Sequence, residues 1–170
     1  MVDDRMNYFT QKILPPILQR RQKHTLIYIA SYFDFVVVRN YLLRKENDFV
    51  SITEYSRGSE INRGRARFLQ GLKPLMLYTG RAHFFFRHKM RGVRHLVFLG
   101  LPEHPQFYSD LVNIINEGLE TDAETTSGDT SNGSIALFTR YDAHALERIV
   151  GTKQANRMLK GEKPTFLFVS

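Results

Sequence analysis

The stretch TLIYIASYFDFVVVRNYL, residues 25–42, decides the fold. It begins with Thr25–Ile29, a run of β-branched, aromatic and aliphatic residues that predicts a buried strand. Ser31 is followed three residues later by Asp34, a spacing that resembles a capping box and predicts the start of a helix. Apolar residues then recur at helical spacing, at Phe35, Val38, Tyr41 and Leu42.

The rest of the chain repeats this alternation of strand and helix. Further strands are predicted at Phe49–Glu54, Pro74–Thr79, Arg94–Leu99, Ser134–Thr139 and Thr165–Val169. Helices are predicted from Ser59 to a C-cap at Gly71, at Pro105–Glu117 ending at Gly118, at Ala143–Val150 and at Lys153–Leu159. In the helix before Gly71, the apolar face is Ile61, Phe68 and Leu69, and the other face carries Arg63, Arg65 and Arg67. This order predicts an α/β fold with an open, mainly parallel sheet and helices on both faces.

A length of 170 residues predicts one domain with a single core. Residues 1–24 are expected to form a helical lead-in broken by Pro15 and Pro16, and residues 25–170 the domain itself. Residues 119–133 are rich in Asp, Glu, Thr, Ser and Gly, so we expect them to form a mobile acidic loop.

Several classes of protein are excluded by composition and motif. The chain has no cysteine, which rules out disulfides and thiolate metal sites. Its longest apolar run is interrupted by Asp34 and is shorter than the roughly 18 residues of a membrane span, and the N-terminus lacks a signal-peptide core. No nucleotide-binding phosphate loop, dinucleotide fingerprint or hydrolase elbow occurs, and the histidines lack zinc spacing. We therefore expect no cofactor, metal or small-molecule substrate.

Positive charge is concentrated in one block. Residues 57–94 contain ten Lys or Arg and one Asp or Glu, whereas residues 95–170 contain six and ten. A local excess of this kind favours a polyphosphate partner such as nucleic acid, although a merely solvated face is equally compatible with it.

The block ends in an unusual segment, RAHFFFRHKMRGVR, residues 81–94. Interleaved Phe, His and Arg could stack on bases and bind phosphates. Three consecutive exposed rings would favour aggregation, so we expect at least one of Phe84, Phe85 and Phe86 to lie in the core.

Several segments together resemble the second RecA-like domain of superfamily 2 RNA helicases. The strand and helix of residues 25–42 resemble motif IV, RARFLQG at residues 65–71 resembles the helix ending in F-x-x-G, and PLMLYTG at residues 74–80 resembles the strand entering motif V. MRGVRHLVFLGLPEHPQFY at residues 90–108 resembles the run into motif VI, and GSIALFTRYDAHAL at residues 133–146 resembles the strand after it.

A more specific resemblance runs over essentially the whole chain. NYFTQKILP at residues 7–15, EYS at 54–56, GLPEHPQFYSDLVN at 100–113 and YDAHALERIVG at 141–151 are similar to the digestive-organ-expansion-factor family. These are helicase-like proteins of the small-subunit processome, associated with U3 small nucleolar RNA. The resemblance implies a nucleolar protein that acts in early maturation of 18S ribosomal RNA, with pre-ribosomal RNA, U3 small nucleolar RNA or processome proteins as partners.

The chain departs from working helicases where arginines are needed. The pattern H-R-x-G-R-x-x-R of motif VI falls on residues 110–117, so its defining positions carry Asp110, Leu111, Asn113, Ile114 and Glu117. The motif V aspartate falls on Arg87 or Lys89, depending on a two-residue gap. Because an arginine finger stabilises the charge of the transferring phosphoryl group, we expect no catalysis.

The remaining expectation is binding of RNA without turnover. Thr79 matches the motif V threonine, and the expected nucleic-acid-binding set is Arg63, Arg67, Thr79, Arg81, His83, Arg87, Lys89 and Arg91. Two alternatives stay open: an RNA-dependent ATPase that needs a separate first domain, and a scaffold that binds only proteins.

Overall fold

A computed structural model describes residues 2–121 and 133–167. The described residues contain one five-stranded parallel sheet with strand order β2-β3-β1-β4-β5. Its strands are β1 (Thr25–Ile29), β2 (Phe49–Ile52), β3 (Leu75–Thr79), β4 (His95–Leu99) and β5 (Gly133–Leu137). Five of the six predicted strands are thus confirmed, with ends shifted by up to two residues, and so is the α/β class.

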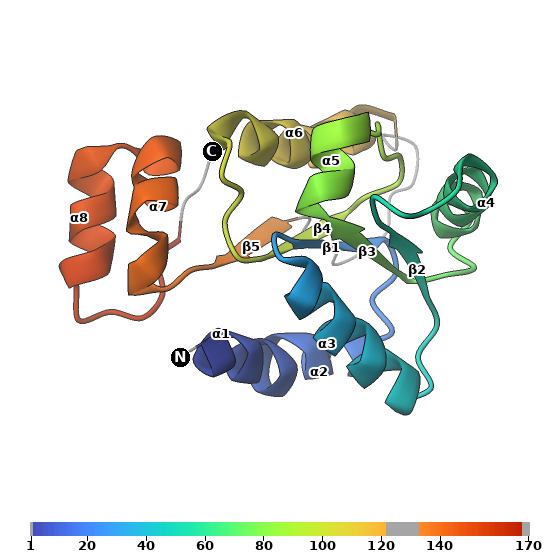
Figure 1. Cartoon of the computed structure of the whole chain (residues 1–170), viewed down its shortest axis with the longest axis horizontal. Coiled ribbons are helices and arrows are strands. Elements are labelled where there is room, and N and C mark those ends of the chain that lie inside the picture. The colour runs from blue at the N-terminus through green and yellow to red at the C-terminus, as the bar shows by residue number, and fades with distance from the viewer. Residues whose placement is uncertain (1, 122–132, 168–170) are drawn as a thin grey trace.

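Two layers of helices cover the sheet (Figure 1). Tyr28 and Tyr78 belong to the core cluster beneath α4 (Gly58–Leu69), α5 (Gly80–Phe86) and α6 (Pro105–Thr121). Ile27 and Leu77 belong to the cluster shared with α3 (Tyr32–Arg44) and the N-terminal helices. Because neighbouring residues of a strand face opposite layers, every residue of β1 and β3 is buried.

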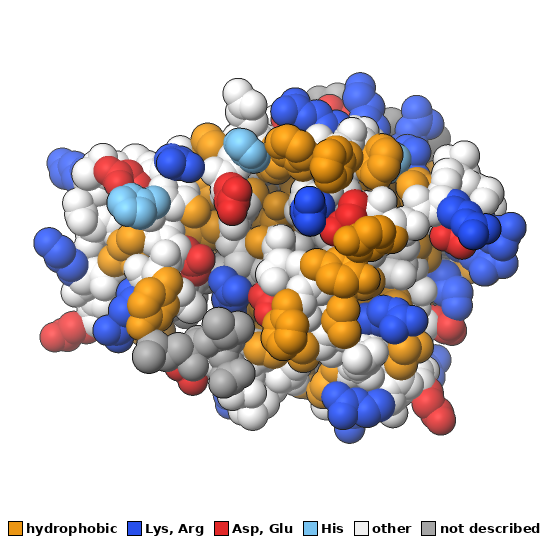
Figure 2. All heavy atoms as spheres, viewed as in Figure 1, with side chains coloured by type: hydrophobic (Ala, Val, Ile, Leu, Met, Phe, Trp, Pro, Cys, Tyr) orange, Lys and Arg blue, Asp and Glu red, His pale blue; other side chains and the backbone are white. Residues whose placement is uncertain are grey.

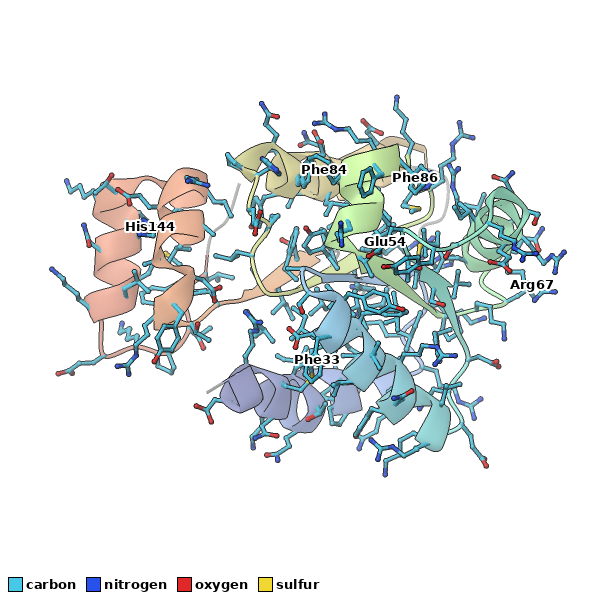
Figure 3. All side chains as sticks on the ribbon, in the orientation of Figure 1. Phe33, Glu54, Arg67, Phe84, Phe86 and His144 are labelled. Atoms are coloured by element: carbon cyan, nitrogen blue, oxygen red, sulfur yellow. The ribbon has the colours of Figure 1, made fainter. Side chains whose placement is uncertain are left out.

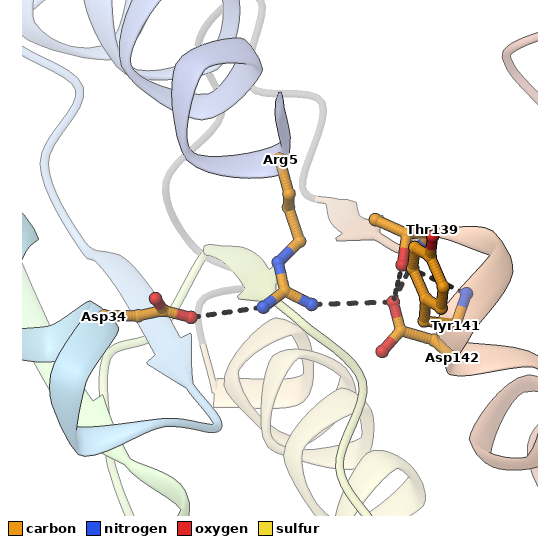
Figure 4. A network of polar contacts seen from close by, with 5 residues as sticks. All are labelled: Arg5, Asp34, Thr139, Tyr141 and Asp142. Atoms are coloured by element: carbon orange, nitrogen blue, oxygen red, sulfur yellow. Dashed lines mark hydrogen bonds and ion pairs between the residues drawn. The ribbon is translucent and has the colours of Figure 1, made fainter. Parts of the chain in front are cut away.

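The helix α3 begins where the sequence predicted, but its capping box does not form. Ser31 is the N-cap residue and makes no side-chain cap hydrogen bond. Asp34 is buried instead, and its Oδ2 accepts a hydrogen bond of 3.1 Å from Arg5. Arg5 also lies 3.5 Å from Asp142, so one guanidinium connects α1 (Val2–Tyr8), α3 and the segment before α7 (Ala143–Val150) (Figure 4). The ion pair satisfies the Asp34 carboxylate and replaces the predicted local contact.

The N-terminal helix is not broken at its prolines. Helix α1 (Val2–Tyr8) continues through a π-helical turn, Phe9–Ile13, into α2 (Leu14–Gln19). Pro15 and Pro16 occupy the first turn of α2, where a missing backbone N–H costs little. Residues 2–19 are thus helical throughout, and the predicted break is wrong because the π turn absorbs the change.

Helix α4 matches its prediction closely. It ends before Gly71, which has a φ of +72° and supplies the left-handed residue that follows the helix. Ile61 and Phe68 are buried as predicted, whereas Leu69 is 48% exposed and was wrongly assigned to the apolar face.

The predicted acidic loop differs from the structure at both of its ends. Helix α6 runs past Gly118 to Thr121, and β5 begins at Gly133, so residues 119–121 and 133 do not belong to a loop. The rest of the predicted acidic loop, residues 122–132, lies outside the described residues.

Helices α7 (Ala143–Val150) and α8 (Thr152–Lys160) form a pair after a short 3₁₀ turn, Arg140–Asp142. Thr165–Leu167 form no strand, and the other residues of that predicted strand lie outside the described part. Phe166 packs against the cluster of α7 and α8 instead of joining the sheet. Within the described residues, no helix has the length and hydropathy to cross a membrane.

Replacing Arg5 with Met tests the ion pair in Figure 4. We expect the free energy of unfolding to fall by about 2–3 kcal/mol, because Asp34 would keep its buried charge without a partner. The matched control is Lys73→Met, whose partner Asp48 has a side chain that is 71% exposed, and about 0–1 kcal/mol is expected there. Urea unfolding followed by circular dichroism measures both, and equal effects would contradict a dominant role for Arg5.

Replacing Gly64 with Ala tests how closely α4 lies on β2. A Cβ at Gly64 would lie 2.5 Å from Cγ1 of Val50, so overpacking should outweigh the gain in helix propensity. We expect a loss of about 1–2 kcal/mol in urea unfolding. The control is Gly58→Ala in the same helix, where nothing lies within 4 Å of the new Cβ and no loss is expected. A Gly64→Ala variant as stable as the parent would show that α4 can move off the strand.

Candidate nucleic-acid interface

Thr79 ends β3 and caps α5. Its Oγ1 accepts a hydrogen bond of 3.3 Å from the N–H of Ala82, and it donates one of 3.0 Å to Oε2 of Glu54. The Thr79 side chain is 1% exposed. Its hydroxyl therefore joins the end of β3 to the segment after β2 and starts a helix, and this threonine of the predicted set is buried.

His83 is also buried, at 3% exposure. Its Nδ1 lies 3.0 Å from the hydroxyl of Tyr78, and its Nε2 lies 3.6 Å from Oδ2 of Asp110. Burial lowers the pKa of His83 and outweighs the opposing effect of Asp110, so the ring is mainly neutral at pH 7. His83 thus lies between α5, β3 and α6, and almost none of its side chain is accessible.

The two arginines of the predicted set at the ends of α5 are exposed. Arg81 lies with its Cζ 6.0 Å from the ring centroid of Phe85. Arg87 follows the last helical residue in a left-handed conformation, with a φ of +40°, and its Cζ lies 5.3 Å from the ring of Phe107. Both cations are held over aromatic rings and remain accessible to anions.

A groove of about 430 Å³ lies between α4 and the segment that follows α5. Lys89 and Arg91 of the predicted set line it, together with Arg65, which the predicted set omitted. The Arg65 guanidinium donates to the backbone carbonyl of Lys89 and so holds the two walls together. The remaining lining residues are Asn62, Ala66 and Leu69. We call this feature the cationic groove.

Arg63 and Arg67 are exposed but do not line the cationic groove. They lie four residues apart and therefore share a face of α4, which differs from the face formed by Asn62, Arg65 and Leu69. Figure 3 shows Arg67 projecting from α4 away from α5. The predicted set is thus divided between two surfaces, and helical spacing within RGRAR could have separated Arg65 from its neighbours.

The three phenylalanines of α5 are all exposed, at 55% for Phe84, 57% for Phe85 and 49% for Phe86. The prediction that at least one lies in the core is wrong. Helix α5 places Ala82 and His83 against the protein, so the buried side of this short helix is already occupied. Figure 2 shows hydrophobic side chains gathered over α5, with Lys and Arg side chains beside them.

The motif VI positions lie on α6, and the two that carry aliphatic residues pack inward. Leu111 is 1% exposed and belongs to the core cluster, and Ile114 packs against the same cluster. Asp110, Asn113 and Glu117 are exposed. Within the described residues, no group of three or more His, Asp or Glu side chains could hold a metal ion.

The fold is similar to that of the second domains of RNA helicases. The C-terminal domain of the DEAD-box protein Dbp5 matches with a TM-score of 0.63 at 13% identity, over 89% of this chain and 78% of that one. Domain 2 of the DEAD-box helicase Mss116p, solved bound to an RNA duplex, matches with a TM-score of 0.60 at 13% identity, over 93% of this chain and 57% of that one. At this identity the likeness establishes the RecA-like fold alone.

Sequence relatives are much closer. The chain is 40% identical to the human U3 small nucleolar RNA-associated protein 25 homolog, over 100% of the chain and 22% of that protein. It is 40% identical to the Arabidopsis thaliana protein NUCLEOLAR FACTOR 1, over 98% of the chain and 21% of that protein. The chain therefore spans about a fifth of the length of these relatives, whose names point to the nucleolus. The family model described as "Utp25, C-terminal domain" matches residues 1–168, and the chain belongs to this nucleolar family.

Proposed function

We propose that the chain is an RNA-binding domain of a ribosome-assembly factor that does not hydrolyse ATP. It acts in the nucleolus during maturation of 18S ribosomal RNA and binds pre-ribosomal RNA, U3 small nucleolar RNA or both, together with proteins of the small-subunit processome. The names of the relatives support association with U3 small nucleolar RNA.

The observation that carries the RNA-binding part is the cationic groove. Arg65, Lys89 and Arg91 meet there from two segments of the chain, in the part that holds ten of its basic residues. Lys89 and Arg91 are exposed, with no carboxylate among the lining residues of the groove to neutralise them. Cations fixed in this way favour binding of a nucleic-acid backbone, because each phosphate that they neutralise releases the counterions condensed on it.

The absence of hydrolysis is inferred from α6. An arginine finger must place a guanidinium on the transferring phosphoryl group, and it accelerates the reaction by several orders of magnitude. At two of the three arginine positions of motif VI this chain has Leu111 and Ile114, whose side chains pack into the core. The third position carries Glu117, which would repel a phosphate.

Neutralising the cationic groove tests RNA binding. We expect a Lys89→Gln and Arg91→Gln double variant to bind single-stranded RNA more weakly, and its log–log salt slope to be shallower by about 0.7 per charge removed. The parent slope should be about −3.5 if about five phosphates are contacted. Fluorescence anisotropy of a labelled 12-nucleotide RNA, titrated at several salt concentrations, gives both quantities.

The matched control is an Arg39→Gln and Lys45→Gln double variant. Both residues are exposed on or beside α3, which covers the opposite layer of the sheet, so this change removes the same charge without touching the groove. Equal losses in the two double variants would mean that only net charge matters. A parent chain without RNA affinity at ~50 mM salt would favour the protein-scaffold alternative.

ATP hydrolysis is expected to be absent. A purified full-length protein that contains this sequence, with or without RNA, should release inorganic phosphate at the rate of a buffer blank, because the motif VI guanidinium groups are missing. Phosphate release above the blank that follows the protein through purification would support the ATPase alternative instead.

A further inference from the structure

A row of five aromatic rings runs along α5 and the residues beside it; four of the rings are exposed and that of His88 is half-buried. The centroids of Phe84 and Phe85 are 5.3 Å apart, and those of Phe85 and Phe86 are 6.4 Å apart. His104 stacks on Phe84 at 5.9 Å, and His88 stacks on Phe86 at 5.2 Å, each with an interplanar angle of 22°. We call these five rings the ring row.

We propose that the ring row stacks against unpaired bases of single-stranded RNA, an inference that rests on the proposed function. Stacking would require RNA that is single-stranded. The cationic groove alone leaves the form of RNA open, because phosphates occur in single strands and duplexes alike. A base paired inside a duplex cannot present its face to a side chain, whereas every unpaired base has a face that can stack on an aromatic ring.

The exposure of the rings supports this assignment. About half of each of Phe84, Phe85 and Phe86 is accessible, a large apolar area for one short helix to leave uncovered. The outer two phenylalanines each have one face occupied by a histidine. Phe85 lies between them, is the most exposed of the three, and has Arg81 at 6.0 Å. Phe85 is therefore the ring best placed to accept a base.

The charges around the row favour RNA over an apolar peptide. Arg81 and Arg87 flank the three phenylalanines along the chain, and Lys89 connects the row to the cationic groove. Three residues of extended chain reach about 10 Å at most, so Phe86 and Lys89 can contact the same short stretch of nucleic acid. The acidic group nearest in sequence to His104 is the exposed Glu103, while Asp110 is directed to the buried His83. Rings for bases and cations for phosphates thus lie side by side.

The chain has no tryptophan, so a single tryptophan placed in the row reports on stacking directly. In a Phe85→Trp variant we expect the fluorescence to be quenched by a 12-nucleotide single-stranded RNA, and not by the duplex of the same sequence at equal occupancy. The control is Phe33→Trp, at a residue on α3 that is 71% exposed and outside the row, whose fluorescence should stay unchanged.

Affinity gives a second readout. A Phe85→Ala and Phe86→Ala double variant should bind the single strand roughly 5- to 100-fold more weakly, with an unchanged salt slope, because stacking and not charge is removed. Phe85→Tyr should retain the parent affinity, and so should Phe33→Ala. Thermal melting checks that the exposed substitutions leave the fold intact.

The outcomes separate this inference from the proposed function. If the parent binds RNA, but the Phe→Ala variants bind equally well and the fluorescence of the Phe85→Trp variant is not quenched, stacking is refuted while the groove proposal stands. If the Phe→Ala variants keep their RNA affinity and lose processome proteins in pull-downs from nucleolar extract, the row is a protein-binding surface and the inference is wrong. A parent chain that binds no RNA overturns both.

Discussion

The structure depends on complete burial of its central parallel strands between two helical layers. Strands β1 and β3 have no exposed residue, so both faces of the sheet must be covered. One layer is α4, α5 and α6, and the other is α3 with the N-terminal helices. The parallel register brings Ile29 opposite both Thr79 and Leu99, so the segments after three strands emerge at one edge. Helix α5 starts at that edge, and the edge therefore positions Arg81 and the three phenylalanines of this helix.

The sheet could be predicted from the sequence because its signals are local. Uninterrupted apolar runs such as Thr25–Ile29 and Leu75–Thr79 identify buried strands without knowledge of their partners. Asp34 shows where this reasoning ends. Its distance from Ser31 suited a cap, but a guanidinium 29 residues earlier in the chain competed for the same carboxylate. Phe166 likewise suited a strand, yet the pair of helices before it offered a nearer apolar surface.

The candidate interface was predictable in its charge and not in its geometry. The basic block is visible in the sequence, but its division into the cationic groove and a separate face of α4 depends on helix phase and on the path of residues 87–91. Helix α5 itself was missed because HFFF has no amphipathic period. Because proteins generally avoid consecutive exposed aromatic rings, the sequence favoured the prediction that at least one of the three phenylalanines is buried. The structure instead buries His83, whose Nδ1 lies 3.0 Å from the hydroxyl of Tyr78, and this leaves the three phenylalanine rings outside.

The strand order β2-β3-β1-β4-β5 also affects how the chain is synthesised. Among these five strands the central one is synthesised first, and neither of the strands that pair with it follows directly: β3 comes at residues 75–79 and β4 at residues 95–99. At translation rates of roughly 5–20 residues per second, β1 waits several seconds before the two strands that pair with it exist. A nascent chain with such non-local pairing is a natural client for chaperones at the exit tunnel.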